Sequence, residues 1–282
     1  MDVSALAMQI SVVAFMIGSL GGVGLSVAPR DVLAPLTHGR FVLLTLAIGW
    51  LAGPAGALLQ LWAMPLDQPY ATALLLLALA PCAPFAPPMM RTAGGDPAYV
   101  AAFMVLSAVV TVLVMPVGVP LLVPGATVSA WDLARPLLLF VLAPLLAGTA
   151  VRGLWPHAAE RLEPAVAAVA RVATLIMLVL VTIMYGRGVL DAVGSHAILA
   201  QVVFVAVVTV VAHLAGAALS APQRVVLTVG MSTRNIGAAL APLAAIERDP
   251  RAIVMIAIAV PVTLVAAAVT ARLLARRATV PA

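Results

Sequence analysis

The sequence predicts an all-α polytopic membrane protein with nine membrane-spanning helices. Three observations predict it: the chain is very apolar, it contains nine long apolar runs, and two of these runs cannot be uninterrupted helices. Of its 282 residues, 64% are hydrophobic and 9% are charged, and the mean hydropathy is +1.19. A soluble domain has about 45–50% apolar and about 25% charged residues. Most of the surface must therefore face lipid, which excludes a soluble fold.

The nine apolar runs each match the length of about 20 residues that crosses the hydrocarbon. They cover residues 5–27, 41–63, 70–90, 97–122, 131–151, 166–185, 198–218, 225–245 and 253–271. The first run exceeds a signal-peptide core of roughly 7–15 residues and follows an acidic segment, so we expect it to be retained. Residues 1–282 are thus expected to form a single transmembrane domain.

Arginine alone carries the positive charge, because the chain has fifteen Arg and no Lys, with a net charge of +5. With the N-terminus outside, ten arginines fall on one side of the membrane and four on the other. The ten are Arg30, Arg40, Arg91, Arg152, Arg161, Arg171, Arg224, Arg272, Arg276 and Arg277, and the four are Arg135, Arg187, Arg248 and Arg251. Cytoplasmic loops are enriched in arginine. We therefore expect a cytoplasmic (inner) membrane protein with its N-terminus outside, its C-terminus in the cytoplasm and no nucleic-acid partner.

The third and eighth runs are expected to be interrupted at mid-depth. The segment Ala80–Met90, APCAPFAPPMM, has four prolines, each of which lacks an amide hydrogen and displaces the carbonyl four residues earlier. The segment Gly230–Leu240, GMSTRNIGAAL, begins with small and polar residues. Such backbone is tolerated at membrane depth only where it is buried in protein or lines a wet cavity.

Short sequence motifs that occur in both halves of the chain predict an inverted repeat. Both interrupted runs are followed by Asp-Pro, at Asp96-Pro97 and Asp249-Pro250, and the run before each contains Leu-Ala-Gly, at residues 51–53 and 214–216. Five helices separate the two interrupted runs, so the copies have opposite orientations. The first repeat spans about 1–124 and the second about 129–276, with discontinuous helices at about 70–90 and 225–245. Paired discontinuous helices are typical of secondary transporters with a site near the midplane.

Arg234 is the one charge placed deep inside a run, about 15 Å from the nearest membrane surface at 1.5 Å per residue. It stays charged, and all ten acidic residues lie at termini or in loops. Two alternative partners of the guanidinium remain. The carbonyls freed by the prolines would make Arg234 a permanent link between the interrupted helices. An anionic substrate would instead be held by the guanidinium with Ser232, Thr233 and Asn235, and we favour this second role.

Other candidate residues carry weaker signals. His213 titrates near neutral pH and is a candidate for proton coupling, against the alternative of a neutral histidine bonded to a neighbouring helix. Cys82 is either a packing residue or a substrate contact, and as the single cysteine it excludes an internal disulfide and a cysteine-based zinc site. No metal and no cofactor are expected. Trp50, Trp62, Trp131 and Trp155 are assigned to the aromatic belts near span ends.

With these features in place, the chain resembles the bile acid:sodium symporter family, including its nine-helix members. The resemblance covers nearly the whole chain and is most evident at Gly230-Met231 with Ala238-Ala239-Leu240-Ala241, and from Pro81 through Gly95-Asp96. It implies a panel domain and a core domain, the core holding two crossing discontinuous helices. It also implies alternating access and transport of organic anions such as bile acids, pantoate or other carboxylates.

The chain departs from this family at the residues that bind sodium. The resemblance places the sodium-binding Glu, Gln and Asn of one helix on Thr228, Ser232 and Thr233, the Ser-Asn pair on Ala86 and Pro87, and a further Gln on Gly49. None of these positions has a charged or amide side chain that could bind sodium. Sodium beside a fixed arginine and without a carboxylate would be repelled. The guanidinium of Arg234 is therefore expected to stand where the charge of sodium stands in relatives.

The sequence thus predicts a secondary active or facilitated transporter of a small organic anion, working by alternating access without the usual sodium site. The substrate-binding residues are predicted to be Arg234, Asn235, Thr233, Ser232, Thr228 and Cys82, with the lipid bilayer as partner and Na⁺ or H⁺ as a candidate coupling ion. An enzyme is disfavoured because HExxH, GxSxG and an embedded aspartate pair are missing. Two alternatives stay open: a substrate-sensing or scaffold protein on a transporter fold, and a sodium-coupled symporter with other ligands.

Overall fold

The computed structural model describes residues 3–123, 126 and 128–278, and within these ranges the secondary structure is helical. Asp2 and position 124, the expected end of the first repeat, lie outside the described residues. The helices are α1 (Val3–Ser26), α2 (Pro29–Leu36), α3 (Gly39–Leu46), η1 (Ala47–Ala52), α4 (Gly53–Ala63), α5 (Gln68–Ala78), α6 (Ala86–Thr92), α7 (Pro97–Leu122), α8 (Ala130–Leu137), η2 (Leu138–Leu142), α9 (Ala143–Leu154), α10 (Pro156–Asp191), α11 (Ala197–Ala215), η3 (Gly216–Ala218), α12 (Ala221–Met231), α13 (Ile236–Ile246) and α14 (Pro250–Ala278). The predicted all-α class is confirmed.

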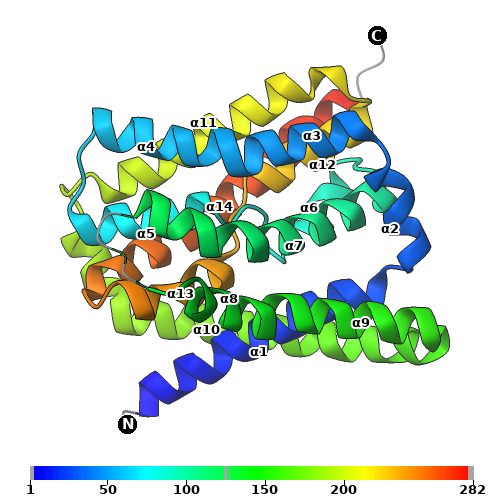
Figure 1. Ribbon diagram of the computed structural model, residues 1–282, viewed down its shortest axis with the longest axis horizontal. Helices are drawn as coiled ribbons and strands as arrows, with labels where there is room; N and C mark the ends of the chain where they lie inside the picture. Colours follow the sequence, from blue (N-terminus) through cyan, green and yellow to red (C-terminus); the bar gives the residue numbers. More distant parts are fainter. Residues whose placement is uncertain (1–2, 124–125, 127, 279–282) are drawn as a thin grey trace.

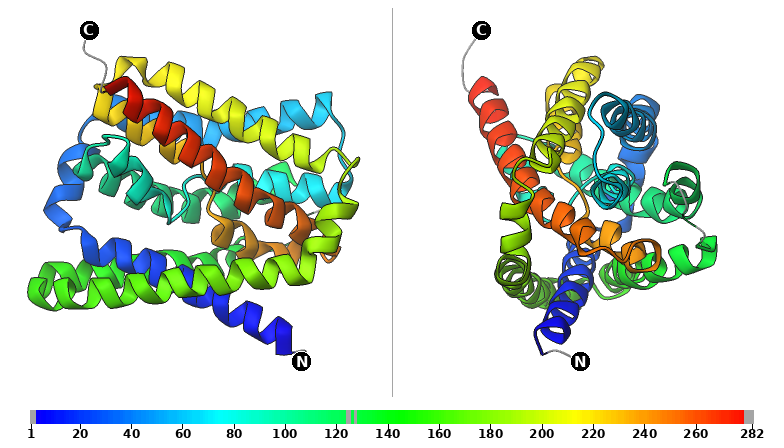
Figure 2. Two further views of the ribbon diagram at one scale, coloured as in Figure 1. Left: turned by 180° about the vertical axis from the view of Figure 1, so that it is seen from behind. Right: turned by 90° about the vertical axis from the view of Figure 1, so that its left-hand side faces the viewer.

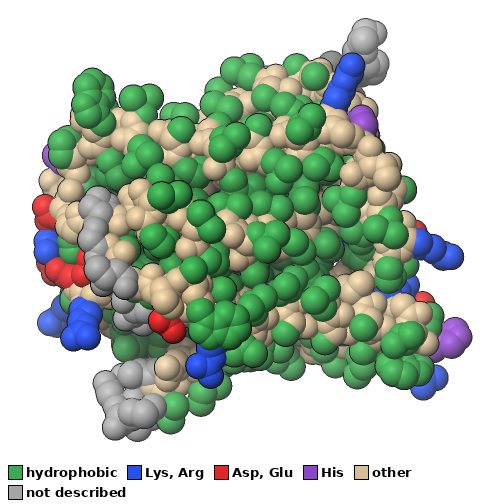
Figure 3. Space-filling model, viewed as in Figure 1, with side chains coloured by type: hydrophobic (Ala, Val, Ile, Leu, Met, Phe, Trp, Pro, Cys, Tyr) green, Lys and Arg blue, Asp and Glu red, His purple; other side chains and the backbone are tan. Residues whose placement is uncertain are grey.

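Seven helical segments of the described chain are long and apolar enough to cross a membrane. They cover Leu6–Ser26, Gly39–Ala63, Pro97–Leu122, Ala130–Leu154, Pro156–Asp191, Ala197–Ala218 and Pro250–Arg276. Charged side chains gather at two opposite ends of the molecule, and the band between them is mainly hydrophobic (Figure 3). This distribution fits a multi-pass integral membrane protein, because only the two ends suit water.

The helices form two groups (Figures 1 and 2). The first group consists of α1, α8, α9 and α10, which lie side by side along the lower edge in Figure 1. The second group holds α3 to α7 and α11 to α14, with α7 near the middle of the molecule. The start of α1 and the end of α14 lie at opposite ends of the molecule.

Glycines allow the helices of the first group to approach closely. A Cβ atom at Gly24 of α1 would lie 2.7 Å from the Thr149 nitrogen of α9 and still closer to the Leu145 carbonyl. A Cβ at Gly18 would lie 3.1 Å from the Ala170 Cβ of α10. Small residues at such crossings let backbones pack directly, which is how helices associate in lipid without a hydrophobic driving force.

Several expectations about the helices need correction. Two of the predicted spans contain a π-helical segment, η1 and η2, where one extra residue widens the turn. The helix expected at 166–185 runs over Pro156–Asp191, so Arg171 lies well inside α10 and not at its end. Trp50 was assigned to a membrane-surface belt but is buried within η1, whereas Trp62, Trp131 and Trp155 are exposed.

The two Asp-Pro helix starts are confirmed. The Asp96 carboxylate accepts hydrogen bonds from the amides of Ala98 and Tyr99, and the Asp249 carboxylate accepts one from the amide of Arg251. Arg251 also binds Asp249 at 2.8 Å and Asp67 at 2.7 Å, which joins the loop before α5 to the loop before α14. The hydrogen bonds from Arg251 lower the pKa of the Asp249 carboxyl below its usual value.

We expect Gly24→Ala to lower the free energy of unfolding by about 1–3 kcal/mol, because the added methyl group collides with the backbone of α9. Gly22→Ala is the matched control, since the nearest atom to a Cβ there, Val166 Cγ1, is 3.8 Å away. Thermal unfolding of both variants in detergent measures the difference. Equal melting temperatures would contradict the tight crossing of α1 and α9.

Candidate functional site

The two runs expected to be interrupted are each split into two short helices. Residues 79–85 separate α5 from α6, and residues 232–235 separate α12 from α13. In the first break, Pro81 and Pro84 cannot donate to a helical ladder, and Cys82 has a positive φ of 68°. Helix α6 begins at Ala86 with Pro87 in its first turn, where the missing amide costs nothing.

The backbones of the two breaks pair with each other. Pro81 and Arg234 form an isolated antiparallel bridge, in which the Cys82 amide donates to the Thr233 carbonyl at 3.0 Å. The Asn235 amide donates to the Ala80 carbonyl at 2.8 Å. Ala80 is one of the carbonyls that the prolines free from the helical ladder. Backbone groups that each break leaves unpaired are therefore satisfied by the other break, which fixes the crossing point of the two chains.

Side chains strengthen this crossing. Thr233 Oγ1 accepts a hydrogen bond from the Ala83 amide and donates one to the Gly230 carbonyl, both at 2.9 Å. Asn235 Oδ1 accepts from the Ala238 amide at 3.1 Å and so caps the N-terminus of α13. The Cys82 Sγ atom lies 3.2 Å from the Met104 Sδ atom of α7. All three side chains are at least 95% buried.

Arg234 lies at the centre of the crossing and is 0% exposed. Its Nη2 donates to the Met231 carbonyl at 3.2 Å, and its guanidinium carbon lies 4.9 Å from the centre of the Phe204 ring of α11. Among the described residues, Nε and Nη1 have no hydrogen-bond partner. The guanidinium therefore contacts the C-terminal end of α12 and an aromatic face, both of which attract a cation.

Thr228 and Ser232, which the sequence resemblance places at sodium-ligand positions, bond to carbonyls of α12. Thr228 Oγ1 donates to the Arg224 carbonyl and Ser232 Oγ donates to the Val229 carbonyl, each at 2.7 Å. At Gly49, a Cβ atom would lie 3.3 Å from both Pro81 and Met231, so this glycine brings η1 against the two breaks. The hydroxyls of Thr228 and Ser232 are thus engaged with backbone carbonyls.

A cavity of about 1000 Å³ lies between the two helix groups. Its lining comes from α1, α8, η2 and α10 on one side and from α13 and α14 on the other. The first turn of α13, at Ile236 and Gly237, closes the cavity near the crossing, where a Cβ at Gly237 would lie 2.6 Å from Met16 of α1. The walls are almost entirely apolar, with four methionines, Met8, Met16, Met177 and Met184.

The structure brings Arg234, Asn235, Thr233, Ser232 and Cys82 together at the crossing, and places Thr228 one helical turn before Ser232 in α12. These six residues do not line the cavity, which reaches the crossing only at Ile236 and Gly237. Their direct contact with substrate therefore stays a prediction. The role of His213 also stays a prediction: its side chain is half-buried near the end of α11, and its carbonyl accepts from Arg224 Nε at 2.8 Å.

Four residues at these sites were missed by sequence reasoning. Phe204 covers the guanidinium, and Gln201, one turn away on α11, is 0% exposed with both amide atoms unpartnered in the described chain. Among the described residues that line the cavity, Gln9 and Tyr185 have polar side chains. The two glutamines are polar residues inside apolar runs, and that signal was available in the sequence.

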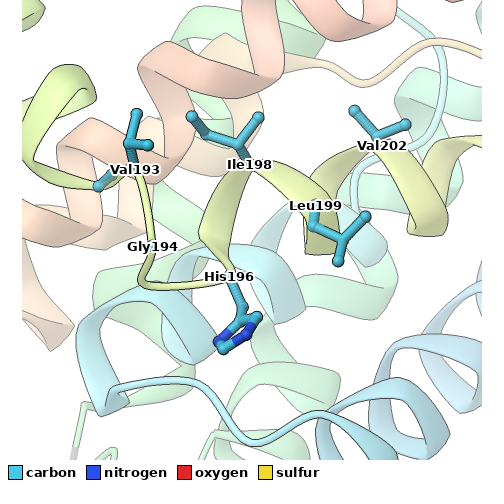
Figure 4. Close-up of a pocket in the computed structure, with 7 residues that line it drawn as sticks. Val193, Gly194, His196, Ile198, Leu199 and Val202 are labelled. Carbon is cyan, nitrogen blue, oxygen red and sulfur yellow. The ribbon is translucent and has the colours of Figure 1, made fainter.

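A second, smaller hollow of about 410 Å³ lies at the loop between α10 and α11 (Figure 4). Its lining includes Val193, His196, Ile198, Leu199 and Val202. In Figure 4 the side chains of Val193, Ile198 and Val202 point to one side, and Leu199 and the His196 ring point to the other. It contains none of the predicted site residues, so it does not compete with the cavity between the helix groups.

The model of the sodium bile acid symporter family matches residues 12–192, which is more than half of the chain. The chain belongs to this family. Its members are transporters and not enzymes, which confirms both the predicted resemblance and the prediction that the chain is not an enzyme. The matched residues include the break between α5 and α6, while Arg234 lies beyond them. A comparison with curated proteins gives no match.

We expect Thr233→Val to lower the free energy of unfolding by about 1–3 kcal/mol, because the buried Ala83 amide loses its acceptor. Ser232→Ala is the control, since the Ser232 hydroxyl donates to the Val229 carbonyl of α12 on its own side of the crossing. Thermal unfolding compares the two variants. If Ser232→Ala destabilises the protein as much as Thr233→Val, the cross-break hydrogen bond is not what holds the crossing.

Proposed function

We propose that this family member carries a small organic anion with an apolar body across the membrane by alternating access. The cavity between the two helix groups is the proposed binding site, and it carries this proposal. Its volume of about 1000 Å³ is large enough for such a molecule, and its walls are apolar. Its inner end is the N-terminal turn of α13, where the helix dipole favours a negative charge.

We propose that the helices cross the membrane as the sequence predicts. The pairs α5–α6 and α12–α13 each cross the membrane as one interrupted helix, which gives nine crossings with the seven long ones. We assign the first helix group to the panel domain and the second to the core domain, and we relate residues 1–124 to 129–276 as inverted repeats. The bridge between Pro81 and Arg234, at equivalent places in the two repeats, supports this relation.

We assign the N-terminus to the outside of the cytoplasmic membrane, on the arginine distribution of the loops. The cavity is lined by the first half of α1, the last part of α10 and the first part of α14. With this orientation these parts all lie in the outer half of the membrane. The conformation would then be one that receives substrate from outside.

We further propose that Arg234 replaces the sodium ion used by relatives. The breaks place the C-terminal ends of α5 and α12 at the crossing, and each carries roughly half a negative charge. The guanidinium bound to the Met231 carbonyl supplies a permanent positive charge there. Thr228, Ser232 and Thr233 all donate to backbone carbonyls, and a sodium ion beside the guanidinium would be repelled.

A sodium-coupled symporter is the second candidate, and the matched family favours it. Sodium would then have to be bound away from Arg234 by ligands other than those of relatives. His213 is retained as the candidate for proton coupling instead.

Replacement of sodium by choline separates these mechanisms. We expect uptake of a labelled organic anion into proteoliposomes to stay within about twofold when all sodium is replaced, because Arg234 supplies the charge at the crossing. Liposomes without protein give the background. Uptake that disappears without sodium would refute the replacement and favour the symporter.

The charge of Arg234 is tested by substitution. We expect Arg234→Gln to abolish uptake while the protein is still expressed and folded, because the negative helix ends lose their cation. Arg234→Lys keeps the charge and should retain part of the activity. Arg187→Gln, at the exposed end of α10, is the control for loss of an arginine. Normal uptake by Arg234→Gln would contradict the proposal that Arg234 supplies the charge needed for transport.

A further inference from the structure

Gln201 is the polar residue on the buried side of α11. The other buried residues of this helix are apolar, namely Ala197, Ala200, Phe204, Val205, Val208 and Ala212. Gln201 is 0% exposed, and neither its amide oxygen nor its amide nitrogen has a hydrogen-bond partner in the described chain. A buried amide without partners is costly, and native proteins almost always supply one from the protein or from ordered water. The partner of Gln201 must therefore come from its immediate surroundings.

The guanidinium of Arg234 lies beside the turn of α11 that contains Gln201. Its carbon atom is 4.9 Å from the centre of the Phe204 ring. Phe204 follows Gln201 by three residues, so both side chains lie on one face of the helix, with Cβ atoms about 5–6 Å apart. Side chains on a helix lean toward its N-terminus, so the Phe204 ring covers the turn of Gln201. A cation held on that ring is a neighbour of the Gln201 amide.

The two groups are complementary in their hydrogen bonding. Nε and Nη1 of Arg234 are donors without a partner in the described part of the chain, and the amide oxygen of Gln201 is an acceptor without one. The sequences of α11, α12 and α13 contain no Asp or Glu, so a neutral oxygen is the side-chain acceptor that these helices offer beside the ring. Gln60 of α4 donates to the Ala200 carbonyl at 2.7 Å, which ties this turn of α11 in place.

We propose that Gln201 is a positioning residue for Arg234: its amide oxygen accepts from the guanidinium through one bridging water molecule. This inference rests on the proposed function, in which transport needs the charge of Arg234. A buried water needs about two to four polar partners, and the guanidinium and the two amide atoms provide them. Gln201 thereby holds the guanidinium between the Met231 carbonyl and the Phe204 ring.

A double-mutant cycle of thermal unfolding in detergent tests this contact without any substrate. Gln201→Glu places a carboxylate beside a buried cation that lacks one, so we expect the melting temperature to rise by roughly 2–4 °C. In the Arg234→Gln background the same carboxylate has no cation to pair with and should lower the melting temperature. A shift that changes sign between the two backgrounds requires that the side chains at these two positions interact.

Transport separates positioning from packing. Gln201→Glu neutralises the charge of Arg234, so we expect it to abolish uptake of radiolabelled naphthalene-2-sulfonate into proteoliposomes although the protein is more stable. Gln201→Met keeps the side-chain size and should lower this uptake about twofold to tenfold, the loss of one hydrogen bond. Gln68→Glu is the control, because Gln68 is exposed at the start of α5, about 15 Å from the crossing along that helix. It should shift the melting temperature equally in both backgrounds.

Each other result contradicts a different step. Equal shifts by Gln201→Glu in both backgrounds, or a variant that folds in neither, would overturn the inference and leave the proposed function standing. A change of sign together with normal uptake by Gln201→Glu would overturn the role of Gln201 in transport. If the wild type takes up no naphthalene-2-sulfonate while the sign still changes, the proposed function fails and the contact between Gln201 and Arg234 stands.

Discussion

The fold depends on one constraint, that backbone polar groups inside a membrane must find partners within the protein. Two segments of the chain, residues 79–85 and 232–235, leave backbone groups without helical partners and supply these partners to each other. The Ala80 carbonyl, freed by a proline, accepts from the Asn235 amide, and the Thr233 carbonyl accepts from the Cys82 amide. Neither break would be tolerable alone in lipid. Their pairing fixes the crossing and therefore the positions of α6 and α13.

The same crossing explains how a buried arginine is accommodated without a carboxylate. The guanidinium of Arg234 has a carbonyl at the end of α12 on one side and the ring of Phe204 on the other. Both partners attract a cation, although neither carries a full charge. In the proposed function, Arg234 supplies a covalently attached cation at this place, which removes the need to bind a free one. As a consequence, the positive charge of Arg234 cannot cross the membrane with the substrate, as the charge of a bound ion can.

The cavity and the crossing differ in the kinds of side chain that they contain. The crossing holds the polar and charged groups, and the cavity offers apolar walls that meet the crossing only through the first turn of α13. In the proposed function, a substrate in the cavity senses the charge of Arg234 through the first turn of α13. This separation suits a site that must bind an anion and still release it, because a buried ion pair would hold the substrate too firmly.

The sequence by itself determined the membrane class, the helical content, the two breaks and the Asp-Pro helix starts, because hydropathy and proline chemistry act locally. Tertiary structure decided what the buried groups touch. The sequence predicts that Arg234 meets freed carbonyls of the first break or an anion, whereas its guanidinium contacts the Met231 carbonyl at the end of α12 and the Phe204 ring of α11. The Ala80 carbonyl accepts its hydrogen bond from the backbone amide of Asn235 instead. The pairings between the two breaks join residues about 150 positions apart, and no local pattern specifies them.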